Sequence, residues 1–304
     1  MNSERVRVWI GFLIVSWVWG STWLAIKIGL GSVPPILGAG MRFVIAGSIL
    51  LVIVKVRKLP IPASPELRRL YLVLILLSYA IPYGVVYWCQ QFIPSGLSSI
   101  LFGAYPLWVA LLSHFLLVKE RLDEYKVVGI VLGFIGIIII FSRDVHWTDS
   151  SGFIGMLGIL STTLMQAFAL VMIKKHGQPI NPFAMNFVGM SAAGVLLCVA
   201  GLAFESPATI VWDAAAIGSI LYLSVVGSVI AFVTYHWLLK RVEAVYLSLV
   251  SFINPIIAVI LGAAVLNETL AASVFVGAAL VLFGILIANG RQLYAKAVVQ
   301  TSGS

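Results

Sequence analysis

The sequence predicts an all-α integral membrane protein with ten transmembrane helices, arranged as two inverted five-helix repeats. The 304-residue chain is 61% hydrophobic and 10% charged, and its mean hydropathy is +1.09, well outside the range of soluble domains. It contains ten apolar stretches of membrane-spanning length. A pattern of proline, acidic and glycine residues also occurs twice along the chain, at an offset of 147 to 149 residues.

The apolar stretches are long enough to cross a bilayer as helices, which satisfy every backbone polar group internally. Polar or basic loops separate them, the fifth is short and the eighth is long. The ten predicted spans are 8–28, 36–54, 70–91, 95–117, 127–142, 153–173, 183–204, 215–238, 244–266 and 271–289.

The repeat consists of matched residues in the two halves of the chain. Pro106 matches Pro255, and the segment at Glu120 matches the segment at Glu268. Because each copy holds an odd number of spans, the second copy starts on the opposite side of the membrane and is inverted. The sequence therefore predicts a first repeat over 1–146, a second repeat over 147–290, and a cytoplasmic tail over 291–304 that ends in a cloning remnant.

The distribution of charge predicts the orientation. Nearly all of the 19 Lys and Arg residues lie near the termini or on alternate loops, whereas Arg143 lies alone on the other side of the membrane. By the positive-inside rule, both termini are cytoplasmic. The net charge of +8 is thus a topology signal, and the expected partners are a lipid bilayer and a small-molecule substrate, with no nucleic acid.

Two charged residues lie inside predicted spans, where an uncompensated charge costs several kcal/mol. Arg42 lies about 10 Å deep in the second span, and its planar guanidinium suits a substrate carboxylate or phosphate. Alternatively, Arg42 binds backbone carbonyls at a broken helix end and joins the two halves. Lys27 lies near the end of the first span, and we expect its side chain to extend to the lipid headgroups.

Four titratable residues near span ends have structural and functional interpretations. His114 and His236 lie near the cytoplasmic ends of spans four and eight, where an interfacial or hydrogen-bonded role is favoured over pH-sensitive gating. Glu120 and Glu268 each precede a helix start, which favours capping, with a gate latch as the alternative. No acidic residue lies near the middle of a predicted span, so proton coupling is disfavoured.

Aromatic and neutral polar residues form the predicted substrate site. Tyr79, Tyr83 and Tyr87 recur every four residues, along one face of span three. Their hydroxyl groups lie deeper than an interfacial belt and need partners, which a hydrated cavity or a polar substrate supplies. Helix packing is the alternative. The predicted substrate-binding residues are Trp17, Arg42, Tyr79, Tyr83, Tyr87, Tyr105, Gln166, Asn186, Ser228 and Asn254.

Pro106 and Pro255 are predicted hinges, because a proline within a span removes a backbone donor and bends the helix. In transporters, interrupted helices mark the binding region and the sites of rocking motion. Gly129, Gly277 and Gly284 in spans five and ten permit close helix contact, either within one half or with a second protomer. A homo-oligomer is left open.

Several short motifs follow one another along both halves of the chain. They include Trp19-Gly20-Ser21-Thr22-Trp23 in span one, Pro34-Pro35 and Arg42-Phe43 at span two, and Ile93-Pro94-Ser95-Gly96-Leu97 before span four. Together with the repeated pattern, they resemble the EamA branch of the drug/metabolite transporter superfamily. The resemblance implies ten helices, a central cavity lined by four helices from each half, and spans five and ten at the periphery. It also implies small polar metabolites or amino acids as cargo, usually exported.

The predicted function is alternating-access transport of small metabolites in the bacterial inner membrane. Amino acids or related amphipathic solutes are favoured as cargo, and the protein is expected to be an exporter or a facilitative exchanger. A proton-coupled multidrug exporter is the main alternative. An intramembrane enzyme is disfavoured because the sequence has no HExxH motif, intramembrane Asp pair or phosphate-binding glycine loop. No cofactor or metal is expected, since the two Cys residues lie apart in apolar segments.

Overall fold

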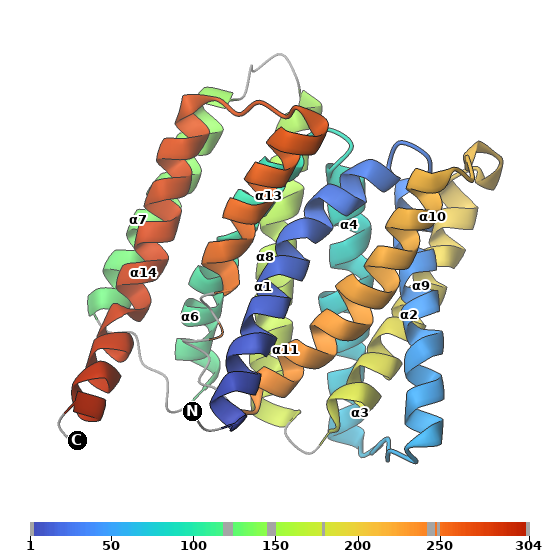
Figure 1. Cartoon of the computed structure of the whole chain (residues 1–304), viewed down its shortest axis with the longest axis horizontal. Coiled ribbons are helices and arrows are strands. Elements are labelled where there is room, and N and C mark those ends of the chain that lie inside the picture. The colour runs from blue at the N-terminus through green and yellow to red at the C-terminus, as the bar shows by residue number, and fades with distance from the viewer. Residues whose placement is uncertain are drawn as a thin grey trace.

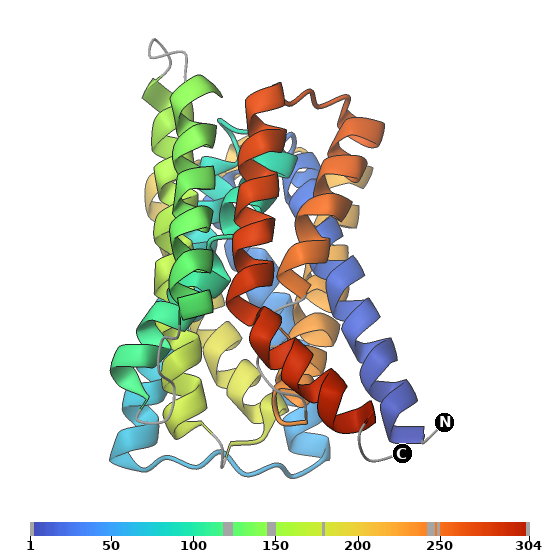
Figure 2. The same ribbon diagram turned by 90° about the vertical axis from the view of Figure 1, so that its left-hand side faces the viewer.

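The helices of this chain form one bundle. The computed structural model describes residues 3–117, 124–144, 150–177, 180–241, 247 and 250–301, and within these ranges there is no strand. Figure 1 shows that the helices run between two ends of the bundle, and that the start of α1 and the end of α14 lie at the same end. Figure 2 shows the same arrangement from the side.

The helix bounds follow the predicted apolar stretches closely. In the first half of the chain they are α1 (Ser3–Gly29), α2 (Pro35–Val56), α3 (Pro65–Val73), η1 (Leu74–Ala80), α4 (Ile81–Cys89), α5 (Ser95–Phe102), α6 (Tyr105–Leu116) and α7 (Glu124–Asp144). In the second half they are α8 (Ser150–His176), α9 (Pro182–Phe204), η2 (Pro207–Thr209), α10 (Ala214–Leu221), η3 (Tyr222–Ile230), α11 (Ala231–Leu239), α13 (Val250–Leu266) and α14 (Ala272–Thr301).

Seven helical segments in the described ranges are long and apolar enough to cross a membrane. They coincide with predicted spans one to four and six to eight. The other three predicted spans contain α7 and two shorter apolar helices, Ile253–Leu266 and Ala272–Gly284. The seven segments are Val6–Gly29, Pro35–Val56, Pro65–Cys89, Ser95–Leu116, Ser150–His176, Pro182–Phe204 and Ala214–Leu239.

Two π-helical stretches, η1 and η3, lie within spans three and eight, and the sequence does not predict them. At the end of η1, Pro82 has no N–H group for the α-helical bond to the Ser78 carbonyl. The Ile81 N–H bonds to the Leu76 carbonyl instead, which is the wider π-helical register. The two stretches begin 148 residues apart, at the offset of the predicted repeat.

The two predicted hinge prolines lie in different surroundings. Pro106 is in the first turn of α6, directly after a turn at Gly103 and Ala104 that separates α5 from α6. Pro255 lies inside α13, where the helix continues without a break. Span four is therefore interrupted at its proline, whereas the proline in span nine is held within one helix.

Two helix pairs, α2 with α9 and α7 with α14, pack closely at opposite ends of the long axis of the bundle (Figure 1). A Cβ atom on Gly194 in α9 would lie 2.6 Å from the Val44 nitrogen in α2. A Cβ atom on Gly136 in α7 would lie 2.5 Å from the Gly277 oxygen in α14. Glycine thus allows backbone-to-backbone contact in both pairs. The glycines of spans five and ten contact each other, across the two halves of the chain.

The remaining helices form two central groups. In the first, which we call the α8 bundle, α8 packs against α4, α5 and α6. In the second, the α1 bundle, α1 packs against α10, α11 and α13. Because α8 belongs to the second predicted repeat and α1 to the first, each bundle combines helices from both repeats.

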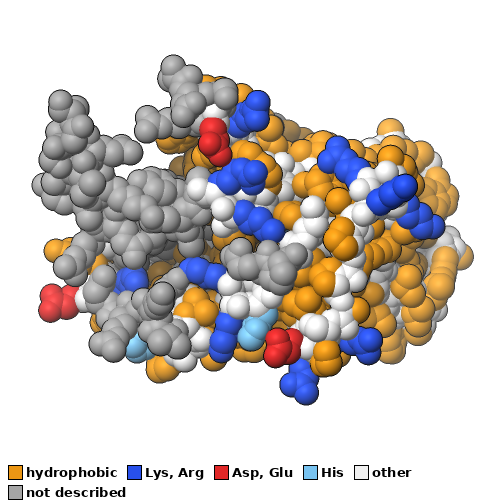
Figure 3. Space-filling view, turned by 90° about the horizontal axis from the view of Figure 1, so that it is seen from below, with side chains coloured by type: hydrophobic (Ala, Val, Ile, Leu, Met, Phe, Trp, Pro, Cys, Tyr) orange, Lys and Arg blue, Asp and Glu red, His pale blue; other side chains and the backbone are white. Residues whose placement is uncertain are grey.

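Charge and apolar surface are segregated on the molecule. The end at which α1 begins, which we call the basic end, also holds the end of α2 with Lys55 and Arg57 and the start of α3 with Arg68 (Figure 3). Large apolar side chains such as Leu13 and Val199, respectively 60% and 62% exposed, lie on the outer helix faces between the two ends. Such a surface suits contact with lipid.

The carboxylate of Asp213 caps α10 at the end opposite the basic end. It accepts hydrogen bonds from the Ala216 N–H and the Ser32 hydroxyl, both at 2.7 Å. Both bonds lower the pKa of Asp213 below its ordinary value, and the bond from Ala216 has the larger effect. The stabilisation is therefore present at neutral pH and is lost as the pH falls through the lowered pKa. We expect Asp213→Asn to flatten the acid side of a profile of melting temperature against pH between neutrality and about pH 3. An unchanged slope would contradict this role.

Candidate functional site

A cavity of about 530 Å³ lies between the α8 bundle and the α1 bundle. This volume suits one small molecule. The cavity extends from Lys174, Gly177 and Lys240 at the basic end to Trp23 and Ile26 in the second half of α1. Its size and its position between the two bundles make it the candidate substrate site.

Aromatic side chains cover much of both cavity walls. On the α1 bundle, the Trp19 ring lies 4.8 Å from the Tyr235 ring and 5.1 Å from the Phe232 ring, between centroids. On the α8 bundle, the rings of Phe102 and Tyr105 stack at 5.7 Å. An apolar, flat part of a solute therefore has aromatic surface available on either side.

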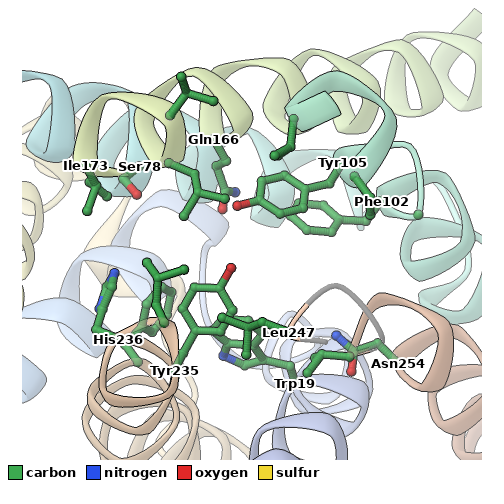
Figure 4. Close-up of a pocket in the computed structure, with 18 of the residues that line it drawn as sticks. Trp19, Ser78, Phe102, Tyr105, Gln166, Ile173, Tyr235, His236, Leu247 and Asn254 are labelled. Atoms are coloured by element: carbon green, nitrogen blue, oxygen red, sulfur yellow. The ribbon is translucent and has the colours of Figure 1, made fainter. Parts of the chain in front are cut away.

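Polar groups from the two walls meet near the middle of the cavity. Figure 4 shows Tyr105 and Gln166 on one wall with their polar ends directed toward the hydroxyl of Tyr235 on the other. The hydroxyl groups of Ser99 and Ser113, which also line the cavity, have no protein partner among the described residues.

The charged residues among the described lining of the cavity are basic. Among the described lining residues there is no Asp or Glu, whereas Lys126, Lys174 and Lys240 lie at the basic end. A cationic group inside the cavity would find no carboxylate among these residues.

Four of the predicted substrate-binding residues line the cavity, and both predicted hinge prolines do as well. The four substrate-binding residues come from four different helices, α4, α6, α8 and α13, so both bundles contribute. The α2 helix contributes no lining residue, contrary to the expectation of four helices from each half. The lining residues predicted from sequence are Tyr83, Tyr105, Gln166, Asn254, Pro106 and Pro255.

Trp17 does not face the cavity. Its side chain is 59% exposed on the outer surface of α1, whereas Trp19 lines the cavity. Residues two positions apart in sequence are separated by about 200° around a helix, so Trp17 and Trp19 point to nearly opposite faces. Trp17 has the depth of a site residue, but it lies on the side of α1 that faces away from the cavity.

Arg42 is only 1% exposed, and it does not line the cavity. Its Nε donates to the Ser228 hydroxyl at 2.8 Å and its Nη2 to the Gly227 carbonyl at 3.3 Å. Both partners belong to η3, so Arg42 joins α2 to a π-helical segment of the other half. The guanidinium carbon also lies 4.8 Å from the centroid of the Tyr83 ring. This geometry agrees with the structural alternative, and it makes Ser228 a partner of Arg42.

Tyr79 and Asn186 also lie behind the cavity wall, where both are fully buried. The Tyr79 hydroxyl donates to Asn186 Oδ1 at 2.6 Å, and Asn186 Nδ2 lies 3.2 Å from His236 Nδ1. His236 does line the cavity, and it is 4% exposed, so it is not an interfacial residue. The hydroxyl of Tyr87 is buried without a partner in the described part of the chain.

Polar contacts lie at the end of the bundle opposite the basic end. The Lys27 ammonium donates to the carbonyls of Gln90 and Ile93, at 2.5 and 3.0 Å. The Glu268 carboxylate accepts from the Ser95 and Gly96 N–H groups at 2.8 and 3.2 Å, and from the Ser95 hydroxyl at 2.9 Å. These contacts join α1 and the segment after α13 to the segment that leads into α5.

Two sequence-based expectations are corrected by these contacts. Lys27 does not extend to the headgroups, because carbonyls at the end of α4 and before α5 take its hydrogen bonds. Glu268 caps a helix, but the helix is α5 in the other half rather than the adjacent α14. Its predicted counterpart Glu120 lies outside the described residues.

The sequence of this helical bundle matches that of a known protein family. The profile of the EamA-like transporter family matches residues 7–142 and again residues 153–290. The chain belongs to the EamA-like transporter family. It is therefore a multi-pass membrane protein of a transporter family.

Other members of the EamA-like family align over most of this chain. It is 29% identical to the uncharacterized transporter YoaV of Bacillus subtilis (strain 168), over 93% of this chain and 96% of YoaV. It is 32% identical to the uncharacterized inner membrane transporter YedA of Escherichia coli (strain K12), over 93% of this chain and 91% of YedA. A crystal structure of another protein has the same fold, with a TM-score of 0.70 at 19% identity over 93% of this chain and 97% of that one.

Several cavity residues of this EamA-like protein escape prediction from its sequence. Trp19 and Trp23 lie in the motif that carries the family resemblance, but only the folded helix shows that they face inward. Tyr235 and His236 are adjacent residues of α11, and both line the cavity. A signal was present, because aromatic residues at four-residue spacing (Trp19 and Trp23) mark one helix face.

Proposed function

We propose that this EamA-like protein carries small amphipathic metabolites across a membrane by alternating access, with amino acids as the first class to test. The observation that carries the proposal is the cavity itself. It reaches the basic end, and we propose that the contacts of Lys27 and Glu268 close it at the opposite end. Rocking of the α8 bundle against the α1 bundle would open one end while it closes the other.

The proposed topology has ten spans with both termini in the cytoplasm of a bacterium and the protein in its inner membrane. The basic residues at one end support this orientation through the positive-inside rule (Figure 3). The position of the two chain ends, at that same end of the bundle, supports an even number of crossings. In this orientation the cavity faces the cytoplasm, so cargo loads from inside, as export or exchange requires.

The two inverted repeats, over 1–146 and 147–290, are part of the same proposal. Their matched positions make matched contacts, which supports a pseudo-two-fold relation. Gly136 lies against Gly277, and Gly284 lies against Gly129. At the repeat offset of 148 residues, Gly284 is the counterpart of Gly136, and Gly277 is the counterpart of Gly129. The two contacts are therefore equivalent. Two separate matches to one family profile, in consecutive halves of the chain, also support a duplication.

The lining chemistry supports a neutral or zwitterionic solute with an apolar body, moved without proton coupling. A proton-coupled multidrug exporter is the second candidate, and His236 in an aromatic-lined cavity favours it. Transport rather than catalysis is supported by the names of YoaV and YedA. Among the described residues, no group of three or more His, Cys, Asp or Glu side chains is placed to hold a metal.

Counterflow in proteoliposomes tests this function. Vesicles are loaded with one unlabelled amino acid at a time, and uptake of the same labelled amino acid is followed with no ion gradient. We expect transient, saturable accumulation for at least one aromatic or aliphatic amino acid, because a carrier exchanges internal for external solute. The control is protein-free vesicles of the same lipid. Accumulation that requires an imposed proton gradient would instead support the proton-coupled exporter.

A further inference from the structure

We infer that His236 binds the substrate directly, as a neutral hydrogen-bond donor for a carboxylate, and that Asn186 sets its tautomer. The inference rests on the proposed transport function and names the chemistry of its cargo. Tyr79 and Asn186 then act on the solute through His236, as positioning residues behind the wall. The structural basis is a buried chain of hydrogen bonds that ends at the cavity.

The direction of each hydrogen bond in the series from Tyr79 through Asn186 to His236 follows from the groups involved. The carbonyl of Pro182 can only accept, so the Asn186 atom 2.8 Å away from it is the amide nitrogen Nδ2. The other amide atom, Oδ1, accepts from the Tyr79 hydroxyl at 2.6 Å. The remaining hydrogen of Nδ2 points to His236 Nδ1, 3.2 Å away.

The tautomer of His236 follows from this arrangement. Because Nδ2 donates to Nδ1, Nδ1 must carry a lone pair and act as the acceptor. In the neutral imidazole the proton is then on Nε2, which becomes a donor. All three side chains are nearly or fully buried, so the arrangement is held within the protein.

His236 presents this donor among groups that favour an acidic solute. Figure 4 shows it on the wall opposite Ser78 and Ile173, beside Tyr235. Lys240, directly after α11, also lines the cavity, where its ammonium donates to the Ile180 carbonyl at 3.1 Å, and no described lining residue is acidic. An oxygen that accepts a hydrogen bond, and above all a carboxylate, is therefore the complementary group.

The aromatic surface next to His236 indicates the rest of the solute. Phe232 lies one turn back on α11, with its ring centroid 6.3 Å from that of His236, and it contacts Trp19. A solute with its carboxylate at Nε2 thus has aromatic surface beside its apolar body. The inferred cargo class is carboxylates with an apolar or aromatic body, with or without an amino group.

Two substitutions of His236 separate substrate binding from a structural role. The amide of glutamine reaches about as far from the backbone as Nε2, whereas the shorter amide of asparagine lies near the place of Nδ1. His236→Gln therefore retains a donor toward the cavity, and His236→Asn retains only the contact with Asn186. Binding of labelled 3-phenylpropionate to purified protein in nanodiscs is the measurement, with 2-phenylethylamine as the cationic comparison.

We expect wild-type protein to bind 3-phenylpropionate about tenfold or more tightly than 2-phenylethylamine. His236→Gln should weaken the binding of 3-phenylpropionate by about threefold at most, and His236→Asn by about tenfold or more, the effect of one hydrogen bond to a charged group. The binding of 2-phenylethylamine should change little in either variant. Equal weakening by both variants, or greater weakening by His236→Gln, would overturn the inference and leave His236 as a partner of Asn186.

Melting curves establish that each variant folds. If neither His236 variant does, Asn186→Leu decides, because it leaves His236 in place but frees its tautomer. We then expect severalfold weaker binding of 3-phenylpropionate, and unchanged binding would overturn the role of Asn186. Counterflow distinguishes the two proposals. Amino acid exchange without 3-phenylpropionate binding would contradict only this inference. Absence of both would also contradict the transport function on which it rests.

Discussion

Replacement of Glu268 by alanine is expected to open the closed end of the cavity. The carboxylate accepts hydrogen bonds from the Ser95 and Gly96 N–H groups, in the first turn of α5, where the helix dipole also favours a negative charge. It joins the end of the α1 bundle to the α8 bundle. Hydrogen bonds to a charged group are worth about 1.5–3 kcal/mol each, so their loss is expected to shift the population of open states by about tenfold or more.

Labelling of a cysteine within the cavity measures this opening. Ser99 lines the cavity on α5, and Ser99→Cys in a chain with Cys89→Ala and Cys198→Ala supplies one thiol there. In right-side-out membrane vesicles, a membrane-impermeant maleimide should label this thiol about tenfold faster when Glu268 is replaced by alanine. Gly262→Val is expected to act in the same direction, because a Cβ atom there would collide with the Glu268 carboxylate.

Glu205→Ala is the matched control. The Glu205 carboxylate also caps a helix of the other half, accepting from the N–H groups of Ile36 and Leu37 at 2.9 and 2.8 Å. However, it joins α9 to α2, which pack against each other along their length and lie outside the cavity wall except for Met185. We expect Glu205→Ala to lower the melting temperature without faster labelling. Equal labelling of both variants would mean that Glu268 stabilises the fold in general and does not close the cavity.

Gly194→Ala is expected to destabilise the protein by about 3 kcal/mol or more. An added Cβ atom would lie 2.6 Å from the Val44 nitrogen and 2.8 Å from the Phe43 carbonyl carbon, and both are backbone atoms of α2 that no side-chain rotation can move away. In an unhindered helix the same change stabilises by up to about 1 kcal/mol. A fall in stability would thus report the close contact between α2 and α9.

Gly218→Ala provides the comparison for this prediction. Gly218 lies in α10, and a Cβ atom there would have no neighbour within 4 Å. Its melting temperature in detergent is therefore expected to stay the same or rise slightly, while that of Gly194→Ala falls. If both variants were equally stable, the backbones of α2 and α9 would have to be further apart than the structure places them.

The positions of the helices could be predicted from the sequence because the length of an apolar run is a one-dimensional property. The helical segment from Pro182 to Phe204, for example, agrees with its predicted span within a residue. The same reasoning fails for the direction of a side chain around the helix. Trp17 and Trp19 have nearly the same depth, but only the packing of α1 against α11 and α13 decides which one faces the cavity.

Contacts between distant parts of the chain also could not be predicted from the sequence. Glu268 caps a helix start 173 residues earlier, which no local sequence signal indicates. Likewise, the partners of Arg42 are a hydroxyl and a carbonyl of η3, a π-helical segment. These two contacts join α2 to a segment 185 residues later, so local composition gives no sign of them. Of the predicted site residues, four line the cavity, whereas Arg42, Tyr79, Asn186 and Ser228 lie one layer behind its wall.

The mixed composition of the two bundles has a consequence for how the protein is made. When the first half has entered the membrane, α1 still lacks α10, α11 and α13, and α4, α5 and α6 still lack α8. The glycine faces of α2 and α7 are meanwhile exposed to lipid, because their partners α9 and α14 have not been synthesised. Neither wall of the cavity can close before the later helices arrive between those already present. The packing of the chain is therefore complete only when its last helices are in place.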